Sequence, residues 1–218
     1  MQNHIQFDAI LFDKDGTIFD SEALSCEAWV ETAKRFNVEF TPEMFHEFIG
    51  VPTDECYRMA HRRFGADFPM QDFIKYNRAY INDAKAKGLP QKAGFSQFFD
   101  FAKQLNIPLG LVTSAGKEST MLSFQRTDFA RYFDTMITVE DVKNPKPAAD
   151  CYLLACKQLS VDPKRTVVFE DSNPGIEAAI AAGCYTVAIP DTLPVSPELA
   201  GQCQHILSSF DDAYQIFR

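Results

Sequence analysis

Short apolar runs alternate with helix-like segments over the second half of the chain. The apolar runs cover 107–112, 135–139, 166–169 and 185–189, with a further short run at 205–207. The helix-like segments between them cover 95–105, 117–124, 148–159 and 175–182, and a terminal helix is expected after the last run. Buried strands separated by helices are typical of a parallel sheet with helices on both faces.

The first apolar run, Ala9-Ile10-Leu11-Phe12, belongs to the same sheet by its character, but a long helical block follows it. The first predicted helix covers 22–36 and follows a helix-start signal at Ser21. A second begins at Thr41-Pro42-Glu43, and two more cover about 54–64 and 70–87. We therefore predict an α/β fold: a Rossmann-like parallel sheet built from residues 1–20 and 90–218, with an inserted all-α cap domain at 21–89.

Two aspartates separated by one residue follow the first run. Because alternate residues of a strand point to the same side, Asp13 and Asp15 are expected to project together where the strand ends. Two carboxylates that lie close together repel each other unless a divalent cation or a shared proton is present. Gly16 then lets the backbone turn away. The local pattern also allows an ordinary Asp-Gly turn.

The ends of the other strands carry complementary groups. Thr113 and Ser114 follow the second run at a helix start, where hydroxyls and backbone N–H groups bind an oxyanion, although Ser114 is also a candidate helix cap. Lys146 stands between two prolines, which would hold its ammonium in a fixed place. Glu170 and Asp171 end a buried strand and are costly there without a cation. Ligands of open parallel sheets bind beyond the carboxyl ends of the strands, so these groups predict a site for a hard cation and an anion.

Composition narrows the class of protein. The 218 residues are 46% hydrophobic and 23% charged, as in globular proteins, and the net charge of −9 argues against a nucleic-acid or anionic-membrane partner. No apolar run approaches the length of a membrane span, and no signal peptide is evident. The six cysteines form no C-x-x-C pair and are expected to be reduced thiols. We expect a cytoplasmic protein that is a monomer or weak dimer.

In their order along the chain, these residues closely resemble the motifs of the haloacid-dehalogenase superfamily of phosphotransferases. Asp13-Lys14-Asp15-Gly16-Thr17 matches the motif D-x-D-G-T, and Thr113 and Lys146 match the second and third motifs. Glu170-Asp171, followed by S-x-x-G-I-x-A-A, matches the fourth. The match covers essentially the whole chain. The helical block is similar to the C1-type cap of the beta-phosphoglucomutase-like phosphatases.

The resemblance implies a role for each acid. Asp13 would be the nucleophile that forms an aspartyl-phosphate, and Asp15 would be the general acid for the leaving oxygen and then the base for water. Mg²⁺ would be held by Asp13, the backbone carbonyl of Asp15, and Asp171. Glu170 would assist directly or through water.

The resemblance also implies how the phosphoryl group is bound. Thr113, Ser114 and Lys146 would hold its oxygens, and Lys146 would also balance the carboxylates. The implied partner is a small phosphorylated metabolite.

The second acid narrows the reaction. Asp15 argues against dehalogenation and phosphonate hydrolysis, which the family carries out without it. A magnesium-dependent phosphatase of a small phosphate monoester remains, with a beta-phosphoglucomutase-type sugar-phosphate mutase as the alternative. The mutases carry a cap histidine and a cap arginine where this chain has Ser25 and Thr53, so the hydrolase is favoured. A binding protein with an inactive site is disfavoured because every catalytic position is filled.

The cap is expected to choose the substrate. Its closure, with hinges near 19–21 and 88–91, would exclude bulk water and complete the site. Ser25 and Thr53 are predicted substrate-binding residues. The full set of candidate cap contacts is Glu22, Ser25, Trp29, Thr53, Lys75, Asn77 and Arg78.

Overall fold

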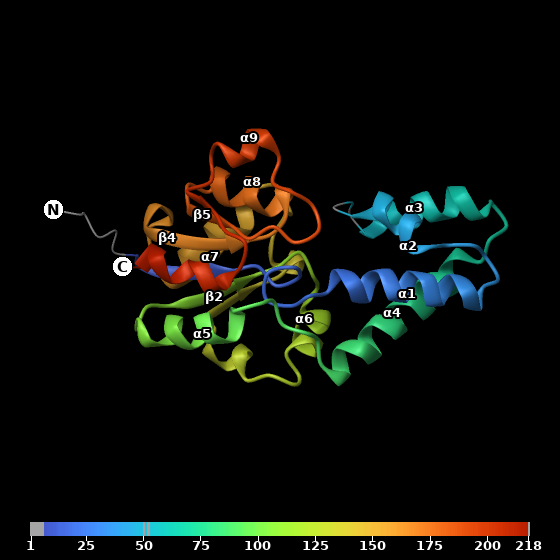
Figure 1. Cartoon of the computed structure of the whole chain (residues 1–218), viewed down its shortest axis with the longest axis horizontal. Coiled ribbons are helices and arrows are strands. Elements are labelled where there is room, and N and C mark those ends of the chain that lie inside the picture. Colours follow the sequence, from blue (N-terminus) through green and yellow to red (C-terminus); the bar gives the residue numbers. More distant parts are fainter. Residues whose placement is uncertain (1–6, 50, 52, 218) are drawn as a thin grey trace.

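A six-stranded parallel sheet forms the centre of the larger part of the molecule (Figure 1). The structure is a computed structural model that describes residues 7–49, 51 and 53–217. The strand order is β3-β2-β1-β4-β5-β6, so β1 lies between β2 and β4, and the predicted parallel α/β fold is confirmed. The strands are β1 Ala9–Phe12, β2 Leu109–Val112, β3 Thr135–Ile137, β4 Thr166–Glu170, β5 Tyr185–Ala188 and β6 His205–Ile206.

Helices flank the sheet and form a separate group beyond one of its ends. Within the described residues, none of them combines the length and the hydropathy needed to cross a membrane. The α-helices are α1 Glu22–Arg35, α2 Pro42–Phe45, α3 Thr53–Phe64, α4 Met70–Lys87, α5 Phe95–Gln104, α6 Lys117–Ser123, α7 Asp150–Leu159, α8 Asn173–Ala181 and α9 Pro197–Ala200. The 3-10 helices are η1 His46–Phe48, η2 Phe129–Tyr132, η3 Val139–Asp141, η4 Pro163–Arg165 and η5 Phe210–Phe217.

Both faces of the sheet are buried, which is why its strands are continuously apolar. Ile10 and Phe12 of β1 point to the face covered by α5 and η5, while Leu11 points to the face covered by α7 and α8. On the first face the Phe12 ring stacks on the Phe169 ring of β4, with centroids 5.4 Å apart. This packing fixes β1 firmly in the middle of the sheet, with its carboxyl end between those of β2 and β4.

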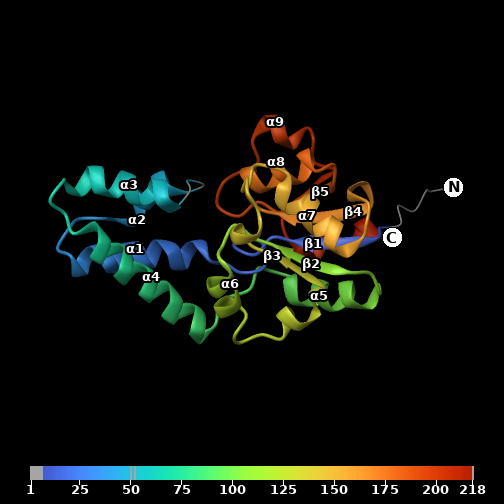
Figure 2. The same cartoon turned by 180° about the vertical axis from the view of Figure 1, so that it is seen from behind.

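The helices α1 to α4 form an insert between β1 and β2 with a hydrophobic cluster of its own. Figures 1 and 2 both show this insert beyond the carboxyl ends of the strands. Trp29 is only 5% exposed and packs against the aromatic rings of Phe40, Phe48, Tyr57 and Phe73.

Two of the predicted cap contacts are therefore wrong. Trp29 belongs to the core of the insert, and Asn77 is fully buried, where it accepts a hydrogen bond from Tyr57 Oη and donates one to Thr32 Oγ1. Burial leaves neither side chain free to face a substrate.

Several element boundaries differ from the sequence-based predictions. The strand predicted at 135–139 ends at Ile137, because Thr138 and Asp141 form a capping box that begins η3. The predicted terminal helix is the 3-10 helix η5. The short helix α9 was not predicted, although Ser196 and Pro197 carry the same start signal as Thr41 and Pro42.

Candidate active site

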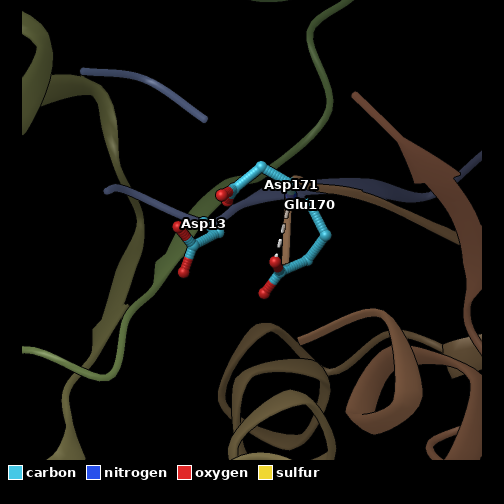
Figure 3. Close-up of side chains that lie close together, drawn as sticks. All are labelled: Asp13, Glu170 and Asp171. Atoms are coloured by element: carbon cyan, nitrogen blue, oxygen red, sulfur yellow. Dashed lines mark hydrogen bonds between the residues drawn. The ribbon is translucent and has the colours of Figure 1, made fainter. Parts of the chain in front are cut away.

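Three carboxylates meet where β1 and β4 end. Asp13 directly follows β1, Glu170 is the last residue of β4, and Asp171 follows it. The backbone N–H of Asp13 donates to the carbonyl of Phe169, at 3.0 Å, so the parallel pairing itself sets the two strand ends side by side. One carboxylate oxygen from each acid lies within 4.8 Å of the others (Figure 3).

Lys146 joins two of these acids. Its Nζ donates to Asp13 Oδ1 at 2.6 Å, to Glu170 Oε1 at 2.6 Å and to the carbonyl oxygen of Val112 at 3.0 Å. The lysine side chain is 5% exposed. Burial alone would lower the pKa of Lys146, but the two carboxylates outweigh it and raise this pKa, so the residue carries a permanent positive charge.

Glu170 is held on both of its oxygens. Oε1 accepts from Tyr152 Oη at 2.6 Å as well as from Lys146, and Oε2 accepts from Ser172 Oγ at 3.1 Å. The backbone N–H groups of Asp171 and Ser172 also donate to Oε2. Ser172 in turn accepts from the N–H of Gly175 and caps the start of α8. These donors satisfy both oxygens of a carboxylate that is fully buried.

Negative charge is in excess at this point of the protein. Asp13, Glu170 and Asp171 can carry three negative charges, and Lys146 supplies one positive charge. Burial is the main cause that raises the pKa of Asp13, to about 7, and that of Asp171 well above its ordinary value. Asp171 accepts a hydrogen bond from Thr17 Oγ1, at 2.9 Å. A bound divalent cation would balance the excess charge and favour the ionised acids.

Asp15 is not a member of this carboxylate cluster and is partly exposed. Its side chain is 38% exposed, and one oxygen forms an ion pair with Lys14 Nζ. Burial alone would raise the pKa of Asp15, but the charges of Lys14 and then Lys85 outweigh it and lower this pKa. The carboxylate is thus ionised in the free protein and still accessible to a ligand.

The predicted phosphoryl-binding residues lie at the end of β2. Thr113 is 4% exposed, and its Oγ1 accepts from the N–H of Ala115 at 3.1 Å. Ser114 is exposed. The alternative that Ser114 caps the following helix is wrong, because Glu140 Oε1 accepts from the N–H of Lys117 at the start of α6.

The two predicted cap residues are in different surroundings. Ser25 is half-buried on α1 and donates to the carbonyl of Ser21 at 3.1 Å, while Thr53 is exposed at the start of α3. Among the described residues, neither forms a hydrogen bond with a strand-end residue. Glu22 has a raised pKa, chiefly from burial and then from the charges of Asp191 and Asp15.

The two remaining cap candidates, Lys75 and Arg78, are exposed on α4. Arg78 lies over the Tyr57 ring and lines a cavity of about 510 Å³ between α3 and α4. This cavity includes none of the strand-end residues, so it is separate from the carboxylate cluster.

Sequence reasoning missed several residues that shape the site. Thr17 lies inside the first motif and Ser172 inside the fourth, but no role was predicted for either. No local pattern marks Tyr152 on α7 or Lys85 on α4. Tyr152 contacts Glu170 and Lys85 contacts Ser119 only because of the way their helices pack against the rest of the protein.

Gly16 provides a direct test of the geometry around Asp171. Its φ is +86°, and an added Cβ would overlap the Asp171 carboxylate. We expect Gly16→Ala to abolish stabilisation by an added divalent cation, in addition to costing roughly 1–2 kcal/mol for the left-handed backbone. Gly183→Ala is the matched control, because its φ is +79° with no atom within 4 Å of the added Cβ. Equal loss of metal response in both variants would contradict this geometry.

The raised pKa of Asp13 predicts a pH dependence of stability. The folded protein keeps this proton up to pH about 7, whereas an unfolded aspartate releases it near 3.8, so the folded state binds more protons between these values. Without Mg²⁺, the free energy of unfolding of wild type should therefore fall relative to that of Asp13→Asn as pH rises from 4 to 7. Thermal melts at several pH values measure it, and Mg²⁺ should stabilise wild type more at pH 8 than at pH 5.

Comparison with known proteins agrees with these observations. Residues 10–189 match the family described as haloacid dehalogenase-like hydrolase. The chain is 32% identical, over 81% of its length and 82% of the other, to a phosphorylated carbohydrates phosphatase of Thermotoga maritima. It is 31% identical, over 84% of its length and 85% of the other, to the validoxylamine A 7'-phosphate phosphatase of Streptomyces hygroscopicus subsp. limoneus. A crystal structure from Thermotoga maritima provisionally named beta-phosphoglucomutase superposes with a TM-score of 0.84 at 27% identity, covering 96% of this chain and 97% of the other.

Proposed function

This chain belongs to the haloacid dehalogenase-like hydrolase family, and we propose that it is a magnesium-dependent phosphatase of small phosphate monoesters such as sugar phosphates. One observation carries the proposal. Lys146 bridges Asp13 and Glu170 beside Asp171, while the Asp15 carboxylate stays open to a ligand. A nucleophile, a charge-balancing cation and a separate acid–base group are what transfer of a phosphoryl group to a carboxylate requires.

The carboxylate cluster fits a hard divalent cation. Its acids lie close enough to share one ion, and they exceed the charge of Lys146 by two. Asp13, Asp171 and the backbone carbonyl of Asp15 would hold Mg²⁺. Because both oxygens of Glu170 already accept protein hydrogen bonds, we assign it a contact through water. The ion would neutralise charge on the phosphoryl oxygens as the carboxylate approaches.

The residues then divide the reaction into two steps. In the first, an Asp13 carboxylate oxygen bonds to phosphorus and the ester P–O bond breaks. Asp15, which must gain a proton before this step because it is ionised in the free protein, gives that proton to the departing alkoxide. In the second, water attacks phosphorus, the bond to Asp13 breaks, and Asp15 takes the proton that water loses. The net reaction converts phosphate ester and water into alcohol and inorganic phosphate. Lys14 and Lys85 favour the ionised form of Asp15, which the second step requires.

Phosphoryl oxygens would be held by Lys146, by the Thr113 hydroxyl and by Ser114, whose exposure at the end of β2 leaves it free to bind.

We propose that residues 1–20 and 90–218 act as the catalytic core and that residues 21–89 act as the cap that selects the substrate. Glu22, Ser25 and Thr53 are the cap residues assigned to this selection. Exchanging Ser25 and Thr53 for the histidine and arginine of the mutases should change substrate preference more than phosphate affinity.

A panel of phosphate esters tests the reaction. With Mg²⁺, we expect release of inorganic phosphate from sugar phosphates, and loss of this activity with EDTA. The mutase remains the second candidate, supported by the similarity to a structure that carries that name. Incubation with hexose phosphates separates the two, because a mutase yields an isomeric sugar phosphate without free phosphate. The isomer alone would overturn the phosphatase assignment.

A further inference from the structure

A buried tyrosine of α7, Tyr152, touches the carboxylate cluster but has no part in the reaction described above. Burying a hydroxyl costs free energy unless it forms a hydrogen bond, and a phenylalanine ring would fill nearly the same volume without this cost. The Tyr152 hydroxyl donates to Glu170 Oε1 at 2.6 Å, a short bond to a charged acceptor. Packing alone does not account for a hydroxyl at this place.

The Glu170 carboxylate is fixed from its other side by the start of α8. Its Oε2 accepts from the backbone N–H groups of Asp171 and Ser172 and from the Ser172 hydroxyl. Gly175 lies directly against it, because a Cβ added there would overlap both carboxylate oxygens. Figure 3 shows the Glu170 side chain turned away from that of Asp171. Glu170 is therefore an anion whose place is set before a ligand binds.

The hydrogens of the Lys146 ammonium are all used in this arrangement. An ammonium has three of them, and those of Lys146 are directed to Asp13 Oδ1, to Glu170 Oε1 and to the carbonyl oxygen of Val112. To hold a phosphoryl oxygen, Lys146 must release one of these acceptors. Asp13 is the acceptor that loses its negative charge when its oxygen bonds to phosphorus, whereas Glu170 stays an anion. We therefore expect the ammonium to turn from Asp13 toward the phosphoryl oxygen.

We propose that Tyr152 is a positioning residue that leaves Lys146 free to make this turn. Its hydroxyl shares the charge of Glu170 Oε1 and fixes that oxygen, so Glu170 anchors the ammonium without drawing it away from the phosphoryl group. The Tyr152 ring borders the same ammonium, since its centroid lies 5.2 Å from Lys146 Nζ. This inference rests on the proposed function, because it takes Lys146 to hold a phosphoryl oxygen.

Binding of inorganic phosphate at saturating Mg²⁺ tests this role. We expect Tyr152→Phe to raise the dissociation constant of phosphate about tenfold, because Glu170 then holds Lys146 more tightly. For a sugar phosphate that wild type hydrolyses, kcat/KM should fall by a similar factor. The Mg²⁺ concentration that gives half of the maximal thermal stabilisation should change less than about threefold, since the substitution acts on the binding of the anion. Calorimetry, steady-state kinetics and thermal melts measure the three quantities.

Tyr57→Phe is the matched control. Tyr57 is 6% exposed, its hydroxyl donates to Asn77 Oδ1 at 3.1 Å, and Arg78 lies over its ring. The substitution therefore also removes a buried hydrogen bond beneath a cation, but within the insert. Both tyrosine variants should lower the melting temperature to a similar extent, whereas Tyr57→Phe should keep the wild-type phosphate affinity and kcat/KM.

Removing the lysine tests whether Tyr152 acts through it. In a Lys146→Met background, Tyr152→Phe should cause no further loss of phosphate affinity. The positioning role would be overturned by an unchanged phosphate affinity in Tyr152→Phe, by the same loss with and without Lys146, or by a loss of Mg²⁺ affinity larger than that of phosphate affinity. If wild type binds phosphate but hydrolyses no ester, the proposed function fails while phosphate binding still decides the role of Tyr152. If wild type does not bind phosphate, both fail.

Discussion

Replacing Asp13 by Asn should abolish turnover while the fold stays intact. The amide is nearly isosteric but cannot attack phosphorus as a carboxylate oxygen does, so we expect a loss of at least about 10⁴-fold in kcat. The substitution also removes a buried acid whose pKa is raised to about 7, so the melting temperature at pH 8 without Mg²⁺ should not fall sharply. Circular dichroism and phosphate release from the best ester of the panel measure the two effects.

An exposed aspartate provides the control for this substitution. The Asp128 side chain is 74% exposed and pairs with Arg131 on the surface, so Asp128→Asn should retain wild-type kcat. A substantial residual rate in Asp13→Asn, above the background of the purified preparation, would refute the nucleophile role. Trapping of phosphate on wild-type protein, absent from Asp13→Asn, gives independent support.

Replacing Lys146 by Ala should damage both activity and stability. Its removal leaves the carboxylates of Asp13 and Glu170 buried without their shared cation, which typically costs about 3–5 kcal/mol. We expect kcat to fall by roughly 10²–10³-fold as well, since the phosphoryl oxygens lose a positive charge. Denaturant unfolding and steady-state kinetics measure the two losses.

The stability loss should depend on pH and on metal. Protonation of the unpaired acids at pH 5 relieves their repulsion, so Lys146→Ala should be less destabilised there than at pH 8, and Mg²⁺ should recover part of the loss. Lys87→Ala removes a lysine whose side chain is 74% exposed and paired with Asp83, and it should change stability by less than about 1 kcal/mol. A destabilisation that neither pH nor Mg²⁺ changes would contradict the charge argument.

Much of the fold could be predicted because its signals are local. The apolar runs at 9–12 and 166–169 and the helix start at Thr41 depend on neighbouring residues alone, and the structure has them close to their predicted bounds. The predicted strand beyond Ile137 failed, because the bond between Thr138 and Asp141 competes with strand pairing. Trp29 and Asn77 were misplaced for another reason, since a helical pattern does not say which face is buried.

The sequence by itself determined which chemical groups stand at the strand ends, including the acids at 13, 15, 170 and 171 and the lysine at 146. Only the tertiary structure decided how they are connected: Lys146 between Asp13 and Glu170, Tyr152 on Glu170, and Lys14 and Lys85 around Asp15. The physical reason is the separation of the interacting residues along the chain. A strand end is a property of a few consecutive residues, whereas a hydrogen bond between residues far apart in the chain exists only after the sheet and its helices have packed.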